Sequence, residues 1–260
     1  MALARALSKR GLASRAEAVA LILAGRVALG GRVVTDPGRL VVPEALDVAI
    51  DGRPAVAPAW RTIAFHKPRG VVTTRRDPGG RPTVHDLLAP LGDALAPAGR
   101  LDLASSGLLV CTNDTRLAAW LTAPGHGVEK EYVVTVRGRV SPAAAAALEA
   151  GVDEGGERLR ARTVRILKAS TRETHLIVVL DEGRNRQIRR LFDWAGHDVT
   201  RLCRVRIGGL GLGDLPPGEW RDIPREMLPR IFPEYSGTRS DRPRRSTPAR
   251  RDAPQRGETP

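Results

Sequence analysis

The segment 99–113 contains a single acidic side chain, Asp102, in a setting where a carboxylate can do chemistry. The short apolar run 108–111 predicts a buried strand, and Ser-Ser-Gly at 105–107 predicts the turn that leads into it. Asp102 would therefore be held rigidly at the edge of a core strand while facing a cleft. Such a carboxylate can serve as a nucleophile or a base. The alternative is that it only caps the turn.

Two further segments carry candidate functional side chains. Tyr132 lies in the alternating segment 130–136, which predicts a strand, and its alternative role is that of a half-buried strand aromatic. The segment 182–192 holds four arginines within seven residues and predicts a helix that continues to about residue 195. Arg189 borders the apolar face of that helix, so its guanidinium is expected to be partly buried and to need an anion. The other arginines of the segment are suited to phosphates.

The elements that must position these residues do not alternate regularly along the chain. The sequence predicts strands at 62–66, 130–136, 164–168, 175–180 and 199–207, and helices at 82–88, 115–121, 142–150 and 182–195. Strands outnumber helices without a repeating strand–helix order, which predicts an α+β fold with a mixed, mainly antiparallel sheet. These elements define a larger domain over residues 61–235.

A small basic α/β module is predicted over residues 1–50, ahead of a Pro/Ala-rich linker at 51–60. Ser14 and Glu17 fit a capping box for a helix that stops at Gly25. A shorter helix around 3–9 precedes it, and 26–34 predicts a hairpin that turns at Gly30-Gly31. Nearly all charged residues before position 36 are positive, which predicts phosphate binding, with a solvated face as the alternative. The main candidates are Lys9, Arg10, Arg15 and Arg26.

The overall charge points to a polyanionic partner. Lysine and arginine number 42 against 29 acidic residues, a formal net charge of +13, and nucleic acid is the simplest partner for it. An anionic membrane is the rival, but the sequence has no membrane-spanning apolar run, signal peptide or lipidation motif, so a cytoplasmic protein is expected. The basic segment 236–260, rich in Ser, Pro and Arg, is predicted to be disordered and either adds RNA affinity or only keeps the protein soluble.

Metal and cofactor chemistry find no support in the sequence. The five histidines show no metal-ligand spacing, and no glycine-rich nucleotide loop is present. Cys111 and Cys203 lie in apolar, strand-like runs and are predicted to be reduced core residues. We therefore expect no metal and no cofactor.

The N-terminal module resembles a known RNA-binding domain, the one named after ribosomal protein S-four. The resemblance rests on residues 7–18, 24–27 and 31–34. That domain grips structured RNA with a helix pair and the loop that follows. The usual pattern has a second basic residue where Ala16 stands, so one RNA contact is expected to be weaker here.

Three motifs in fixed order resemble the pseudouridine synthases: Gly99-Arg100-Leu101-Asp102 with Gly107-Leu108-Leu109, then Lys130-Glu131-Tyr132, then the run 182–190. The basic N-terminal module and the segment 66–70 narrow the resemblance to the RsuA-type ribosomal RNA branch. The segments 77–84 and 215–220 resemble the large-subunit RluB type more than the small-subunit enzyme. The family often has Thr at the position of Ser105 and Gly at that of Thr115, and neither departure touches the expected chemistry.

The resemblance implies a reaction and roles for individual residues. Uridine would be isomerised to pseudouridine in ribosomal RNA without redox or energy input. Asp102 matches the catalytic carboxylate, Arg189 the cation that pairs with it, and Tyr132 the aromatic that stacks on the target base. Arg100 matches the residue that helps to displace the nucleotide from its helix, because the base must leave the stack before it can react. We expect substrate contacts from Lys130, Arg184 and Arg186, and a monomer that acts on structured ribosomal RNA, such as an assembly intermediate.

Several rival functions can be weighed on the same residues. A small-subunit pseudouridine synthase and a non-catalytic ribosome-assembly factor both stay open as alternatives. An RNA methyltransferase would need a glycine-rich cofactor loop, and a glycoside hydrolase would need a second carboxylate facing Asp102. The sequence has no such loop, and the motif around Asp102 contains no second acidic residue. Whether Asp102 attacks C1′ or abstracts a ribose proton also stays open.

Overall fold

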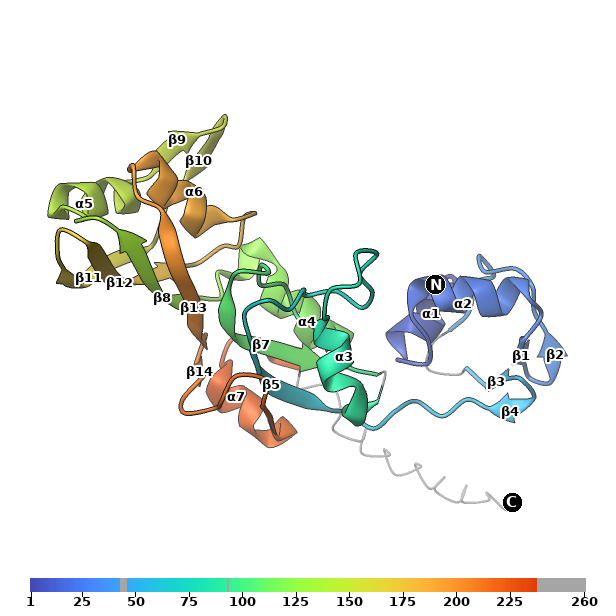
Figure 1. The fold of residues 1–260 in the computed structure, drawn as a ribbon. Coiled ribbons are helices and arrows are strands. Elements are labelled where there is room, and N and C mark those ends of the chain that lie inside the picture. Colours follow the sequence, from blue (N-terminus) through green and yellow to red (C-terminus); the bar gives the residue numbers. More distant parts are fainter. Residues whose placement is uncertain (43–45, 93, 238–260) are drawn as a thin grey trace, which may run out of the picture.

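The computed structural model describes residues 1–42, 46–92 and 94–237, so most of the segment 236–260 lies outside the described residues. It has two parts that are joined by an extended segment (Figure 1). The first part contains two helices, α1 (Leu3–Lys9) and α2 (Arg15–Leu23), and a sheet in the order β2-β1-β3-β4. The strands of this sheet are β1 (Val27–Leu29), β2 (Arg32–Val33), β3 (Val48–Ile50) and β4 (Arg53–Pro54).

The helix cap and the hairpin turn that the sequence predicts for the N-terminal part are both present in the structure. The Ser14 hydroxyl accepts from the backbone N–H of Glu17, and the Glu17 carboxylate accepts from the N–H of Ser14, so the predicted capping box is present. Gly30 and Gly31 both have positive φ angles and form the two-residue turn between β1 and β2. A turn of that kind matches the twist of the flanking strands, as the hairpin prediction requires.

The sheet of the N-terminal part extends beyond residue 50, into the range predicted as a linker. Asp51 and Gly52 have φ angles of 52° and 72°, and they connect β3 to β4 as a second two-residue hairpin. An Asp-Gly pair favours this turn because both residues tolerate positive φ. The prolines of 51–60 led to the prediction of a linker in place of a hairpin. Pro54 is tolerated in the hairpin because it lies on the edge strand β4, which needs no N–H donor on its outer side.

The second part is built on one mixed sheet in the order β11-β12-β8-β13-β7-β5-β15, with β14 paired to β13 and β6 paired to β7. Its strands are β5 (Thr62–Lys67), β6 (Ala96–Pro97), β7 (Ser106–Thr112), β8 (Lys130–Arg137), β11 (Thr163–Ala169), β12 (Glu173–Leu180), β13 (Val199–Ile207), β14 (Leu210–Gly211) and β15 (Trp220–Asp222). The pairing of β13 with β7 is parallel, and the other strand pairings of this sheet are antiparallel. The α+β prediction with a mainly antiparallel sheet is confirmed.

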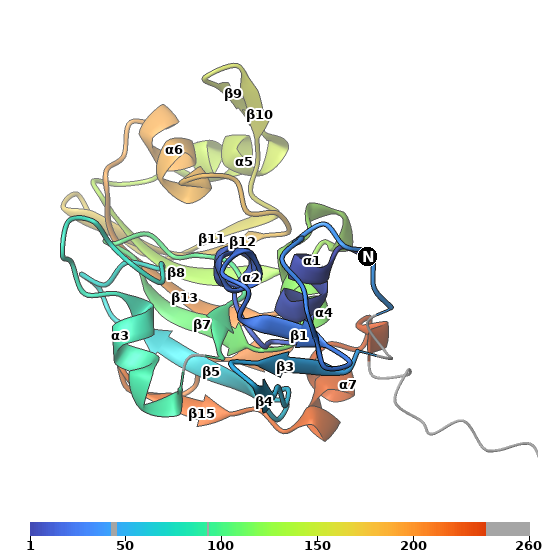
Figure 2. The same ribbon diagram turned by 90° about the vertical axis from the view of Figure 1, so that its right-hand side faces the viewer.

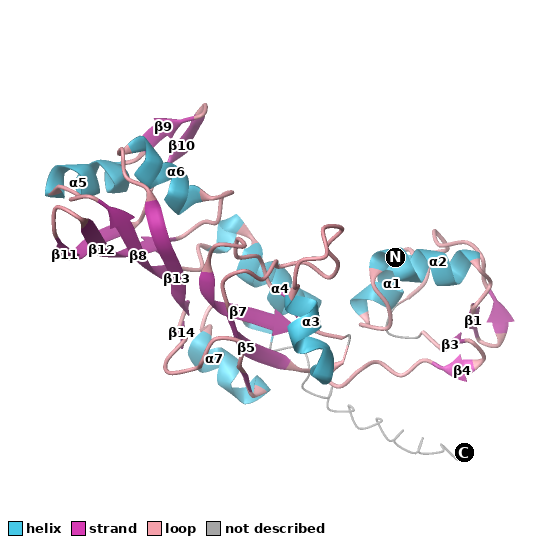
Figure 3. Cartoon of the chain, in the orientation of Figure 1, coloured by secondary structure: helices cyan, strands magenta, loops and turns pink. Residues whose placement is uncertain are grey.

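Helices cover the two halves of this sheet differently (Figures 2 and 3). The helices of this part are α3 (Val84–Leu88), α4 (Thr115–Thr122), α5 (Pro142–Ala150), α6 (Gln187–Trp194) and α7 (Leu228–Ile231), and a small hairpin of β9 (Val152–Glu154) and β10 (Glu157–Leu159) stands beside α6. Helices α5 and α6 pack on the half formed by β8, β11, β12 and β13. No helix within the described ranges is both long and apolar enough to cross a membrane.

Strand β7 is buried on both faces, which explains its continuous apolar run. Leu108 and Val110 pack with α4 and with residues at and beside α7, whereas Leu109 and Cys111 pack against α3 on the opposite face. A strand covered on both sides loses the alternation of apolar and polar residues. Burial raises the pKa of the Cys111 thiol to about 12, in keeping with its predicted role as a core residue.

Gly107 lies where β7 and β13 meet in parallel, opposite Arg204. Its φ angle is +110°, and a Cβ atom there would lie 2.2 Å from the carbonyl oxygen of Arg204 and 2.5 Å from its nitrogen. Both contacts are with backbone, so no side chain can move aside. The close approach of the two strands therefore requires glycine.

Gly107→Ala is expected to destabilise the fold by about 3 kcal/mol or more, because the strands must separate and the residue must hold a strained φ. Thermal unfolding of the purified variant measures this loss. Gly80→Ala is the matched control, since Gly80 also has a positive φ of +69° but has nothing within 4 Å of the added Cβ. Equal losses in the two variants would show that backbone strain, not strand contact, sets the effect.

Candidate active site

The turn that carries Asp102 lies slightly earlier than the sequence predicts. The backbone N–H of Ser105 donates to the carbonyl oxygen of Asp102 at 3.0 Å, so the turn spans 102–105. Ser106 and Gly107 already belong to β7, because the parallel contact with β13 extends that strand toward the turn. Asp102 is thus the first residue of the turn, and its side chain is 41% exposed.

Three neighbouring segments hold the backbone of this turn. The Thr73 hydroxyl donates to the carbonyl oxygen of Leu101 at 2.7 Å and accepts from the N–H of the same residue at 3.2 Å. The N–H of Gly70 donates to the carbonyl oxygen of Leu103 at 2.8 Å. The ammonium of Lys67, which is fully buried, donates to the carbonyl oxygen of Ser105 at 2.9 Å. The backbone that carries Asp102 is therefore fixed by hydrogen bonds, while the carboxylate itself stays open to solvent.

A pocket of about 180 Å³ opens beside the Asp102 carboxylate. It joins segments that are far apart in sequence: the turn before β7, strands β8 and β13, and the loop 182–186 that precedes α6. The sequence-predicted residues that line it are Arg100, Asp102, Lys130, Tyr132, Arg184 and Arg186. Tyr132 is 8% exposed, so its ring forms part of the inner wall. The pocket has the scale of a single base and not of a helix.

The loop 182–186 is fixed by the buried side chain of Gln187. The Gln187 amide nitrogen donates to the carboxylate of Glu182 at 2.6 Å and to the carbonyl oxygen of Arg160 at 2.9 Å. Its amide oxygen accepts from the N–H of Arg184 at 3.1 Å. The predicted helix is shorter than expected, because Arg186 has a φ of 49° and α6 begins only at Gln187. Arg184 and Arg186 therefore lie on the loop, where they face the pocket.

The structure gives Arg189 a different partner from the one predicted. Its Nη1 donates to the carbonyl oxygen of Val199 at 2.8 Å, and its buried Nε has no hydrogen-bond partner. The cation that pairs with Asp102 is Arg186, at 4.0 Å between Nη1 and Oδ2. Burial and the charge of Arg186 lower the pKa of Arg189, while the charge of Asp102 raises it. Arg189 thus interacts with the charge of Asp102 but forms no ion pair with it.

Positive charge dominates the pocket. Two carboxylates, those of Asp102 and Glu182, face five cationic side chains: Arg100, Lys130, Arg184, Arg186 and Arg204. Burial, together with the charge of Arg204, lowers the pKa of Lys130 to about 8, and Asp181 opposes the shift. Burial lowers the pKa of Lys67 to about 8 as well, with Asp102 opposing and Arg204 adding to the shift. Such a site favours an anionic ligand.

The pKa of Lys130 predicts a pH dependence. Its ammonium carries its charge below pH 8 and loses it as the pH rises through that value, so the turnover rate should fall on the alkaline side. Lys130→Arg keeps the charge at every accessible pH and should extend the plateau to higher pH. The measurement is the single-turnover rate from pH 6 to pH 10. An unchanged alkaline limb in the arginine variant would assign the decline to another group.

Among the N-terminal candidates, Lys9 and Arg15 are exposed, and Nη1 of Arg10 donates to the carbonyl oxygen of Leu46 at 2.7 Å. Arg26 forms two hydrogen bonds to the Asp51 carboxylate, at 2.7 and 2.6 Å. Asp51 therefore neutralises most of the charge of Arg26 in the free protein. The structure leaves Lys9 and Arg15 as the more available cations of this group.

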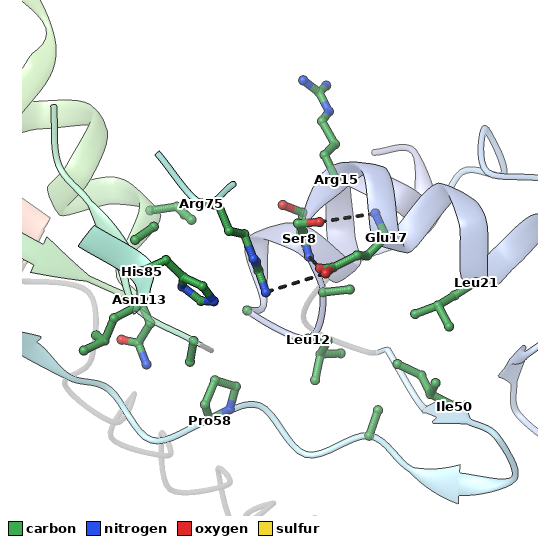
Figure 4. A pocket seen from close by; sticks show the side chains of 18 of the residues that line it. Ser8, Leu12, Arg15, Glu17, Leu21, Ile50, Pro58, Arg75, His85 and Asn113 are labelled. Carbon is green, nitrogen blue, oxygen red and sulfur yellow. Dashed lines mark hydrogen bonds and ion pairs between the residues drawn. The ribbon is translucent and has the colours of Figure 1, made fainter. Parts of the chain in front are cut away.

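A second and larger cavity, of about 1080 Å³, lies between the two parts of the chain (Figure 4). Arg15 and Arg26 line it from the N-terminal part, and His85 and Asn113 line it from the larger part. Arg75 reaches across to Glu17 at 3.6 Å, which joins the two parts by an ion pair. The cavity lacks Asp102 and Tyr132, so it is separate from the pocket that contains the candidate catalytic residues.

Sequence reasoning missed four residues of the site: Lys67, Thr73, Gln187 and Arg204. Two of them leave a signal in the sequence. Lys67 ends an otherwise apolar strand, and Arg204 shares a strand face with Leu202, where an apolar residue is expected. Thr73 and Gln187 leave none, because a hydroxyl and an amide are common in loops and helices.

Comparison with known proteins places this geometry in a family. Residues 61–194 match the RNA pseudouridylate synthase family, and residues 3–46 match the S4 domain. An uncharacterized RNA pseudouridine synthase of Aquifex aeolicus is 35% identical over 87% of this chain and 91% of its own length. Ribosomal large subunit pseudouridine synthase B of Escherichia coli (strain K12) is 38% identical over 85% of this chain and 78% of its own. A crystal structure of a pseudouridylate synthase superposes with a TM-score of 0.65 at 26% identity, covering 89% of this chain and 99% of the other.

The chain therefore belongs to the RNA pseudouridylate synthase family and is an isomerase with an RNA-binding S4 domain. Its relatives place it in the RsuA-type branch, near the RluB proteins, as the motifs predict. The family assignment is confirmed. The roles of individual pocket residues stay predictions that the geometry can support.

Proposed function

We propose that the protein isomerises a uridine of large-subunit ribosomal RNA to pseudouridine, with Asp102 as the catalytic carboxylate. The observation that carries the proposal is the pocket that Asp102 and Tyr132 both line, together with several cationic side chains. The pocket accepts one base, so the target uridine must leave its helix to reach it. The relative from E. coli (strain K12) acts on the large ribosomal subunit according to its name, and this chain is 38% identical to it over 228 residues.

We assign a role to each pocket residue from its position. Arg100, Arg184 and Arg186 lie on exposed loops at the mouth, where they bind the phosphates that flank the displaced nucleotide. Tyr132 supplies a flat wall for the uracil ring. Asp102, held by its turn, is then directed at the ribose, where it attacks C1′ or removes a ribose proton.

The exposed cations Lys9 and Arg15 extend the RNA contact to the N-terminal part. Arg15 lines the cavity between the two parts, so RNA bound by the N-terminal part can extend along it toward the larger part. Contacts to phosphates give affinity without selecting a sequence. Selection of the uridine therefore falls to the fold of the RNA, such as that of an assembly intermediate, and to the pocket itself.

The function is tested with RNA that carries tritium at C5 of uridine, because isomerisation releases that tritium to water. Unmodified large-subunit and small-subunit transcripts are assayed separately, as free RNA and as particles from cells that lack the protein. Release from the large-subunit RNA alone supports the proposal. Release from the small-subunit RNA alone would replace it with the small-subunit alternative, and release from neither would reject Asp102 chemistry on ribosomal RNA.

A further inference from the structure

Arg204 occupies the centre of the site although the chemistry above gives it no task. It lies on β13 directly between Tyr132 on β8 and Gly107 on β7. Paired residues on neighbouring strands project from the same face, so its side chain lies next to the Tyr132 ring. Gly107 has no side chain, and the backbone of Arg204 occupies the place where its Cβ would lie. The Arg204 Nε donates to the carbonyl oxygen of Leu108 at 2.7 Å.

The charge of Arg204 is uncompensated in the free protein. The residue is 4% exposed, and its Nη2 is buried without a hydrogen-bond partner. Among the described residues it has no ion pair with any carboxylate, and the nearby charges of Lys67 and Lys130 are also positive. A buried guanidinium in that position costs stability unless an anion arrives. Proteins keep such costly groups mainly at functional sites.

The position of Arg204 favours the base as its partner over a phosphate. The guanidinium belongs to the inner wall of the pocket, beside the aromatic ring, while the exposed arginines of the mouth are available for phosphates. When the C1′–N1 bond of uridine breaks, its electron pair leaves with the base. The negative charge is then shared by N1, O2 and O4 of the uracil. That charge exists only during the reaction, which is where a preorganised cation accelerates most.

We propose that Arg204 stabilises the departing uracil anion by donating to one of its carbonyl oxygens. This inference rests on the proposed function. When C5 later bonds to C1′, the electron pair moves into the new bond, C5 loses its proton and N1 gains one. The base becomes neutral again, and no further reactant is consumed. Arg204 holds the charge between these two events, and Lys130 adds to the positive field from the neighbouring strand.

Arg204→Gln tests the proposal, with Arg201→Gln as the matched control on an exposed position of the same strand. The expected result is a single-turnover rate at saturating RNA that falls by about 10²-fold or more, with the Kd for RNA unchanged. The control should keep the wild-type rate. A weakened Kd with an unchanged rate would identify a phosphate contact and overturn the proposal. An inactive wild-type protein would instead reject the function on which it rests.

Two further measurements separate the role of charge from that of packing. Arg204→Lys keeps the charge and should be faster than Arg204→Gln, and equal rates would overturn the proposal even if both variants are less stable. The second measurement uses RNA with 5-fluorouridine at the target, because fluorine stabilises the uracil anion without help from the protein. The factor lost in Arg204→Gln, followed as consumption of the nucleoside, should be smaller on this RNA. An equal factor on both RNAs would reduce Arg204 to a structural residue.

Discussion

Asp102→Asn should stop pseudouridine formation, with a loss of about 10⁴-fold or more, the scale seen when a catalytic nucleophile or its partner is removed. The amide has the same shape as the carboxylate but can neither attack C1′ nor accept a proton there. The hydrogen bonds that hold the turn all end on backbone atoms, at Leu101, Leu103 and Ser105. The variant should therefore keep the wild-type fold, melting temperature and affinity for RNA.

Tritium release measures the expected loss of isomerisation, and equilibrium RNA binding measures the affinity that should be kept. Asp153→Asn is the matched control, because Asp153 is an exposed aspartate on β9, outside the pocket, whose ion pair with Arg158 lies at the surface. It should retain full activity. If Asp102→Asn retained isomerisation after purification, the carboxylate would have no essential role and the whole assignment of the pocket would fail.

The parts of the fold that sequence predicts well are those decided by local chemistry. The capping box at Ser14, the glycine turn at Gly30 and the double-sided burial of β7 each follow from a few adjacent residues. The hairpin at Asp51 was hidden by its prolines, although Asp-Gly is itself a turn signal. The parallel contact of β7 with β13 joins residues about a hundred positions apart, so no local sequence pattern predicts it.

The site also has residues that the sequence predicts and residues that only the structure reveals. Asp102 and Tyr132 can be predicted because their motifs are long and ordered, and the structure brings them into one pocket. The partner of Asp102 could not be predicted from helix periodicity. The left-handed backbone at Arg186 starts α6 late, so Arg186 points at the carboxylate while Arg189 turns toward Val199. Arg204 reaches the pocket only through sheet pairing.

The two cations near Asp102 should differ in effect. Arg189→Ala is expected to lower the turnover rate by about 10²-fold or more, because the half-buried Arg189 guanidinium interacts with the Asp102 charge where solvent screening is reduced, and its removal also breaks the hydrogen bond to Val199. Arg186→Ala should cost about tenfold or less, since an ion pair at 4.0 Å with a 55% exposed side chain is screened by solvent. Single-turnover rates at saturating enzyme measure both losses independently of RNA affinity.

Salt and a charge-conserving substitution distinguish an electrostatic role from a structural one. The loss in Arg186→Ala should shrink as ionic strength rises, because salt already weakens the exposed pair in the wild type, whereas the loss in Arg189→Ala should persist. If the charge of Arg189 acts on Asp102, Arg189→Lys should restore part of the rate that Arg189→Ala loses, and Arg189→Gln should not. Equal rates in the lysine and glutamine variants would mean that Arg189 only secures the helix to Val199 through its hydrogen bond. The larger loss in Arg186→Ala would instead make the visible ion pair the one that sustains the carboxylate.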